Sequence, residues 1–149
     1  MIGLLVFECS NKAEQSKDSA GENVEKNQSK LNLDTILRID TFKDIPDEID
    51  GCACYYFLSK RDETTKTYLF VNDFGRIAFI ALNGSIERFD LVDSETKDFF
   101  TYRNGPYFLS IKIEKKEEKG DELTSMEGVL TLSFGGRRVV KQFVGSCGC

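Results

Sequence analysis

Two Cys-x-Cys pairs constrain the fold of this chain more than any other feature of its sequence. Cys52 and Cys54 open its apolar part, and Cys147 and Cys149 close it. Residues i and i+2 of a β-strand point to the same face, so each pair would present two thiols side by side. If the two segments are antiparallel neighbours, Cys52 faces Cys149. The inner two, Cys54 and Cys147, then face each other as well, whereas a parallel arrangement would exchange the partners.

The residues between these pairs follow the period of β-strands. Apolar and polar side chains alternate in short runs, which turn signals such as Asn83-Gly84 and Gly135-Gly136 separate. Asn-Gly is a dipeptide favoured in type I′ hairpins. Strands separated by turn signals about every eight to twelve residues indicate an all-β barrel or sandwich. The expected strands span residues 52–58, 67–71, 76–82, 85–92, 99–103, 107–114, 123–134 and 137–144.

The cysteines favour the barrel. About eight consecutive hairpin-linked strands place the first and last strands in opposite directions, which agrees with antiparallel pairing of Cys52 and Cys149. Disulfides there would lock the seam of a small meander barrel, and closure leaves the sheet no open edge. A disulfide that closes the long loop between the two Cys-x-Cys pairs contributes about 4 to 5 kcal/mol to stability on the chain-entropy model. We expect a disulfide-closed β domain over residues 32–149, with a β-sandwich as the alternative.

The same four cysteines allow two other interpretations. They could hold a structural zinc ion, although zinc sites usually have about two to four residues between paired cysteines. The Cys-Gly-Cys segment at 147–149 is flexible and exposed enough for thiol exchange, but no histidine or helix N-terminus is visible beside it to lower a thiol pKa. Disulfides fit the spacing best, so the sequence predicts neither a metal nor a cofactor.

The segment before the first expected strand carries a mixed signal. Residues 33–42 fit either a strand or a helix. Residues 44–49 predict one short helical turn, since Asp44 can cap it and Pro46 is tolerated in a first turn. The acidic run from Asp44 to Asp50 could also offer oxygen ligands to Ca²⁺, but it lacks a regular ligand loop. A solvated, capped turn is the expectation.

Cys9 stands apart from the other cysteines. It follows an apolar run from Met1 to Phe7 and precedes a polar segment. This resembles the end of a bacterial lipoprotein signal peptide, although the run is short, has no basic part, and has Glu8 where a small residue is usual. We expect residues 1–9 to be the remnant of a signal peptide and Cys9 to be lipidated. The lipid would anchor the protein to a membrane of the bacterial cell envelope, on the periplasmic or outer-membrane face. A cytosolic N-terminus with a buried cysteine is the alternative.

Residues 10–31 predict a disordered polar tether. Val24 is the only sizeable apolar side chain between Ser10 and Lys30. Such a segment cannot bury enough surface to offset the entropy lost on ordering. As a flexible chain it would span roughly 25 Å.

Composition argues against several classes of function. The chain contains no histidine and carries a net charge of −5. Histidine is the commonest general base near neutral pH and the commonest metal ligand, so its absence argues against an enzyme. An acidic chain also lacks the basic surface that nucleic acids require. We expect no catalytic residues and no nucleic-acid partner, with a small carboxylate-using enzyme as an alternative.

Two aromatic groups, Tyr55–Phe57 and Phe99–Tyr102, lie in expected strands. They could line a ligand cavity or form an interaction patch. Adjacent strand positions face opposite ways, so about half of these rings must point outward or be covered by the segment before Cys52. Ordinary core packing with such a cover is the simpler expectation.

Four segments after Asp44 carry a resemblance to known proteins. They are residues 45–55 (IPDEIDGCACY), 68–73 (YLFVND), 82–84 (LNG) and 145–149 (GSCGC). Together they resemble short bacterial lipoproteins of uncharacterised function, and this resemblance implies no particular activity.

A looser similarity links Phe70 to Phe89 with the membrane-bound inhibitors of C-type lysozyme. Those inhibitors are short, lipid-anchored antiparallel barrels with an Asn-Gly hairpin. Their Ser-Gly-containing loop, which enters the lysozyme cleft, has no match in residues 93–97 or 102–107. No inhibitory residue is therefore carried over to this chain.

Together these features predict an envelope-anchored, non-enzymatic binding or inhibitor domain. The alternative is a structural lipoprotein whose partner is another envelope protein. A pocket inside the barrel would support the first function. A packed interior with a flat apolar outer patch would support the second.

Overall fold

The structure is a computed structural model that describes residues 36–149. The signal-peptide remnant expected over residues 1–9, the lipidation of Cys9 and the tether expected over residues 10–31 lie outside the described residues.

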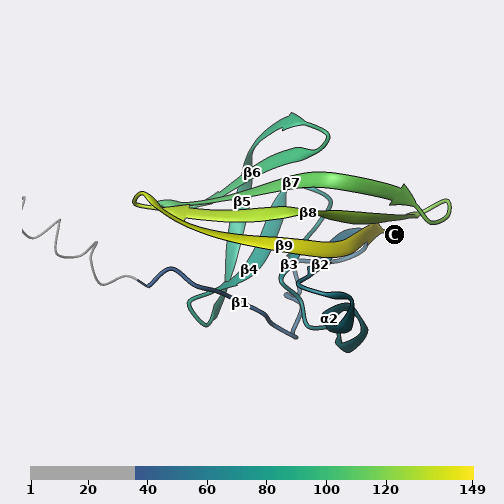
Figure 1. The fold of residues 1–149 in the computed structure, drawn as a ribbon, viewed down its shortest axis with the longest axis horizontal. Coiled ribbons are helices and arrows are strands. Elements are labelled where there is room, and N and C mark those ends of the chain that lie inside the picture. The colour runs from purple at the N-terminus through teal and green to yellow at the C-terminus, as the bar shows by residue number, and fades with distance from the viewer. Residues whose placement is uncertain (1–35) are drawn as a thin grey trace, which may run out of the picture. The chain divides into compact units, whose positions relative to one another are not determined.

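Eight strands form a closed antiparallel barrel (Figure 1). Each strand pairs with the next along the chain, and the last returns to pair with the first. The strands are β2 (Ala53–Phe57), β3 (Phe70–Asn72), β4 (Ile77–Leu82), β5 (Ser85–Thr96), β6 (Phe99–Asn104), β7 (Tyr107–Glu118), β8 (Leu123–Phe134) and β9 (Arg137–Gly148). The predicted eight-stranded all-β barrel is confirmed, and the sandwich alternative does not hold.

The seam between β2 and β9 carries both disulfides. Cys54 lies directly opposite Cys147 in the antiparallel register, and a disulfide joins the two residues with their Cα atoms 4.0 Å apart. The next pair outward, Cys52 and Cys149, is also bonded, with a Cα separation of 4.1 Å. These are the partners expected from the two Cys-x-Cys spacings. Short Cα separations belong to non-hydrogen-bonded pairs of an antiparallel ladder, and positions two apart are the same kind of pair, so both bridges fit together.

Aromatic rings fill the barrel interior on the β2 side. The ring of Tyr56 stacks on that of Phe70 at 5.1 Å between centroids and on that of Phe143 at 4.1 Å. Aliphatic side chains from β7 and β8 complete the interior. The largest fully buried side chains are Tyr102, Phe70, Phe89, Leu69, Ile80, Leu109, Ile111, Leu130, Leu132 and Val71.

A second hydrophobic cluster covers the outer face of β2, β3 and β4. The short strand β1 (Ile39–Asp40) pairs with β4, and Phe42 forms an isolated bridge to Tyr68. The cluster comprises Phe42, Phe57, Tyr68, Val71, Phe79 and Ala81, with Ile45, Ile49, Tyr55, Ile77 and Val144 packed against it. The predicted cover over the outward aromatic rings is therefore confirmed, and this part of the barrel is buried on both faces.

A short helix that the sequence did not predict connects β2 to β3. α2 (Lys60–Thr65) begins after Ser59, whose Oγ accepts a hydrogen bond from the backbone N of Asp62 at 3.2 Å. It ends at Lys66, which has a left-handed φ of 52°. Because the helix has no buried residue, the sequence shows no apolar periodicity there. The strand expected from residue 67 begins later, at β3.

The one short helical turn expected over residues 44–49 corresponds to a single hydrogen-bonded turn. The backbone N of Ile49 donates to the carbonyl of Pro46 at 3.0 Å, and no helix follows. Asp44 caps no helix, because its carboxylate has no hydrogen bond within residues 36–149.

Three strands run further than expected. β5, β7 and β9 extend four residues beyond their predicted ends at 92, 114 and 144. The loops expected over 93–98 and 115–121 are therefore mostly strand, and hairpins β5–β6 and β7–β8 extend out from the barrel (Figure 1). The residues added to β5 and β7 are exposed on both faces. The alternation of apolar and polar residues that reveals a half-buried strand is consequently absent there.

Candidate functional site

A cavity of about 390 Å³ opens at the end of the barrel where the disulfides lie. Four parts of the chain meet there: the β2–β9 seam, the β3–β4 loop, the β5–β6 turn and the β7–β8 turn. The lining residues are Cys54, Tyr56, Asn72, Phe74, Gly75, Lys97, Phe100, Ile113, Asp121, Glu122, Thr124, Met126, Cys147 and Cys149. Because the turns that meet are far apart in the sequence, closure of the barrel is what creates the cavity.

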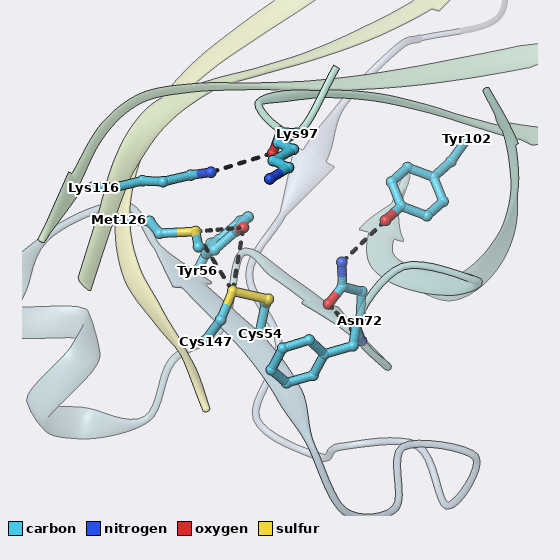
Figure 2. Close-up of a disulfide and its surroundings, with 9 residues drawn as sticks. Cys54, Tyr56, Asn72, Lys97, Tyr102, Lys116, Met126 and Cys147 are labelled. Atoms are coloured by element: carbon cyan, nitrogen blue, oxygen red, sulfur yellow. Dashed lines mark hydrogen bonds between the residues drawn. A yellow bond between two sulfur atoms is a disulfide. The ribbon is translucent and has the colours of Figure 1, made fainter. Parts of the chain in front are cut away.

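The floor of the cavity combines aromatic carbon with sulfur. The hydroxyl of Tyr56 donates toward Sδ of Met126 at 3.5 Å, and it lies 3.7 Å from Sγ of Cys147 (Figure 2). The two sulfur atoms are 3.5 Å apart. Cys147 is in a disulfide and has no proton to donate, so Tyr56 is the only donor among the three. Sulfur is a weak acceptor, which leaves this buried hydroxyl weakly satisfied.

The Tyr56 hydroxyl is held in its neutral form. Burial raises its pKa above the ordinary value of a tyrosine, and the nearby Tyr102 raises it further. The group is therefore a hydrogen-bond donor, not a base, at physiological pH. A ligand oxygen in the cavity would be a better acceptor for this proton than either sulfur.

One wall of the cavity depends on Asn72, which is buried at the end of β3. Its Nδ2 donates to the hydroxyl of Tyr102 at 3.0 Å, and its Oδ1 accepts from the backbone N of Phe74 at 3.2 Å. Burial raises the pKa of Tyr102 to about 12, although the hydrogen bond from Asn72 partly offsets this effect. One amide thus joins the barrel core to the β3–β4 loop.

Phe74 forms the rim above that wall. Its backbone has a φ of 71°, a region that bulky side chains rarely adopt. Its ring is 54% exposed although it lines the cavity. The Asn72 hydrogen bond to its backbone N holds this unusual conformation, which keeps an aromatic ring at the opening.

The rim also carries charges of both signs. Lys97 lies at the β5–β6 turn, and its carbonyl oxygen accepts a hydrogen bond from Nζ of Lys116 at 3.3 Å (Figure 2). Lys116 itself is ion-paired with Asp98. Asp121 and Glu122 come from the β7–β8 turn. Within residues 36–149, none of the side chains of Lys97, Asp121 and Glu122 has a hydrogen bond or ion pair.

The cysteines do not form a metal site. All four that could have held zinc are in disulfides, so no free thiolate remains for a metal. Across residues 36–149, no three histidine, cysteine or acidic side chains converge as metal ligands would. The acidic run from Asp44 to Asp50 belongs to the exposed turn before β2.

The two aromatic groups separate into different environments. Tyr56 and Phe100 line the cavity, while Tyr102 lies in the core behind it. Tyr55 and Phe57 face the outer cluster. The simpler expectation of core packing holds for most of these rings, and the cavity interpretation holds for two.

The sequence did not reveal the residues that complete the site. They fall between the expected strands, where no pattern indicates a site: Asn72, Phe74, Lys97, Asp121 and Glu122. Met126 lies within the strand expected over residues 123–134, and the structure places it at the cavity floor.

Comparison with protein-family models, with curated proteins and with solved structures found no match. In the described part of the chain, no helix is both long and apolar enough to cross a membrane.

Proposed function

We propose that this chain is a non-enzymatic binding domain of the bacterial cell envelope, which takes a small ligand in the cavity at its barrel mouth. The observation that carries the proposal is the cavity itself. Its volume, about 390 Å³, lies within the range of roughly 300–1,000 Å³ typical of small-molecule sites. It combines a mostly apolar floor with a few polar groups, which is how such sites usually provide affinity and orientation.

The surroundings of the cavity favour a preformed site. The disulfide Cys54–Cys147 lines it, and the second disulfide lies at its edge. Two cross-links on one seam restrict the motion of β2, the strand that carries Tyr56. A preformed site loses less entropy on binding than one that must be ordered by its ligand.

The envelope location rests on the cysteines. Disulfides persist in oxidising compartments and are rare in the cytosol. The apolar run before Cys9 supports export and lipidation, which would attach the domain to a membrane through residues 10–31. Mass spectrometry of the native protein tests this part: a diacylglycerol-modified Cys9 supports it, and a retained Met1 on a water-soluble protein contradicts it.

A methyl NMR experiment tests the binding function. The chain has only two methionines, and Met126 lies on the cavity floor. ¹³C-methyl methionine labelling of the unprocessed full chain therefore gives one reporter inside the site and one at Met1. The Met126 signal is the one lost in Met126→Leu. Screening a chemically diverse fragment set should find compounds that shift the Met126 signal in a saturable manner while the Met1 signal stays in place. A set that leaves the Met126 signal unchanged would contradict the proposal.

An envelope protein as partner is the second candidate. Phe108 and Val140 are exposed large apolar side chains, 44% and 54% accessible. Phe108 is paired with Ser133 and Val140 with Thr131, two positions apart on β8, so both point to the same outer face. A photoreactive amino acid at position 140 should then cross-link to one envelope protein, and Phe108→Ser should abolish the product. If Phe108→Ser leaves the yield unchanged, this face is not the interface.

A further inference from the structure

We infer that the ligand of the cavity is a short apolar peptide with free termini. This inference rests on the proposed binding function and names the chemistry of the ligand. A free peptide carries an ammonium and a carboxylate several bonds apart, with apolar side chains between them. The cavity offers partners for each of these three features.

The rim provides charges of opposite sign on two different turns. Lys97 is on the β5–β6 turn, whereas Asp121 and Glu122 are on the β7–β8 turn. No ion pair within 4.0 Å joins the lysine to either acid, and none of the three has another partner in residues 36–149. A ligand that meets both turns must therefore carry separated charges.

Several other charges near the same turns are already paired. Lys116 binds Asp98, and Nζ of Lys119 lies 2.7 Å from Oε1 of Glu117. The lysine and acids that line the cavity are thus distinct from the charges that stabilise the hairpins. A purely anionic ligand would face two uncompensated carboxylates, and a purely cationic ligand would face Lys97. A zwitterion satisfies both sides.

The floor supplies the apolar part of the site and carries no charge. Ile113, Met126 and the disulfide Cys54–Cys147 present carbon and sulfur to the cavity. The weakly satisfied hydroxyl of Tyr56 adds one neutral donor, which suits a peptide carbonyl. Apolar side chains of the peptide would therefore enter the cavity, and its charged ends would remain at the rim.

A set of four dipeptides tests this inference, with the full chain, both disulfides formed, and the Met126 methyl signal as the readout. The set contains Leu-Phe with free termini, its N-acetyl form, its C-terminal amide and the form blocked at both ends. Rim charges are exposed, so each lost ion pair should weaken binding about two- to fivefold at low ionic strength. The free dipeptide should bind tightest and the doubly blocked form weakest.

Variants of the rim identify which end meets which turn. Lys97→Met should weaken only the two peptides with a free carboxylate, to the affinity of their amides. Asp121→Asn combined with Glu122→Gln should weaken only the two peptides with a free ammonium. Lys119→Met, which removes a lysine already paired with Glu117, is the matched control and should change no affinity.

The outcomes separate this inference from the proposed function. If other fragments shift the Met126 signal but the dipeptides do not, or if all four dipeptides bind equally, the peptide inference fails and the binding function stands. Tighter binding of hexylphosphocholine, a zwitterion of lipid type, would also overturn the peptide assignment. If no compound of any class shifts the signal, both proposals fail.

Discussion

Tyr56 lies directly opposite Gly145 across the seam between β2 and β9. A Cβ atom on Gly145 would stand 2.1 Å from the carbonyl oxygen of Tyr55 and 2.8 Å from Cδ1 of the Tyr56 ring. The absence of a side chain at this position is what allows the ring to cross β9 and stack on Phe143. The floor of the cavity and the closure of the barrel therefore depend on the same glycine.

Gly145→Ala should destabilise the domain by about 1–3 kcal/mol, the usual cost of forcing extra atoms into a packed site. The atom that the new Cβ meets first belongs to the backbone, so rotation of a side chain cannot relieve the clash. Ser146→Ala, at the next and half-buried position, is the control and should change stability little. Urea denaturation measures both. Equal stability of Gly145→Ala and wild type would mean that a Cβ atom at position 145 fits the seam without a clash.

The two disulfides should stabilise the domain as one unit. They close loops with sequence separations of 97 and 93 residues, so either bridge alone imposes nearly the whole chain-entropy constraint. Replacing one pair by alanine should cost little beyond its lost packing. Replacing both pairs should cost about 4 to 5 kcal/mol more. Denaturant unfolding of both single-bridge proteins and of the bridge-free protein measures this difference, and additive losses would contradict it.

Removing the hydroxyl of Tyr56 should have a smaller effect on stability than removing that of Tyr102. Tyr56 donates only toward sulfur, so Tyr56→Phe leaves no nitrogen or oxygen without a partner. Tyr102→Phe removes the acceptor of the buried Asn72 amide, and such an unsatisfied group costs about 1–3 kcal/mol. Thermal and urea unfolding of the two variants, which lose the same atom, provide the comparison. A larger loss of stability in Tyr56→Phe would show that the Tyr56 hydroxyl has a stronger hydrogen-bond acceptor than these sulfur atoms.

The buried tyrosines should make the domain sensitive to alkaline pH. Burial raises the pKa of Tyr102 from 10.0 to about 12, so in that interval the native state keeps a proton that the unfolded chain releases. The stability gained from this group is complete below pH 10.0 and is lost as the pH rises toward 12. Tyr56 acts in the same direction. The free energy of unfolding should therefore fall with pH in this range.

Tyr102→Phe should make this fall less steep, because one of the three tyrosines with a raised pKa, Tyr56, Tyr68 and Tyr102, is gone. Urea unfolding at a series of pH values measures the slope for each protein. An unchanged slope in the variant would assign the pH dependence to other groups.

Most of the barrel could be predicted because its strands are half-buried. Apolar and polar side chains alternate along residues 107–114, which reveals a strand. The dipeptides Asn83-Gly84 and Gly135-Gly136 reveal the turns that connect strands. The two Cys-x-Cys spacings then identify the pair of strands that close the sheet. Each of these signals reflects a local constraint of side-chain direction or backbone conformation, which a sequence carries directly.

The parts that could not be predicted lack that constraint. α2 buries no residue, so its strongest signal is the cap between Ser59 and Asp62, which also fits a turn. No local sequence pattern marks the cavity. Lys97 and Glu122 both line it only because strands longer than predicted bring their two turns to one end of the barrel. A sequence read by periodicity shows how strands pair, but not which turns converge.

The position of β9 between β2 and β8 has a consequence for the timing of folding. Until β9 is available, β2 and β8 both present unpaired edges, and the first hairpins cannot close into a barrel. β9, which is made after all the other strands of the barrel, is thus the one that completes the sheet. Closure joins residues more than ninety positions apart, a long-range pairing of the kind that slows folding. The edges of β2 and β8 in a newly made chain therefore stay open until β9 has been made, and any other strand that reaches them first can pair with them.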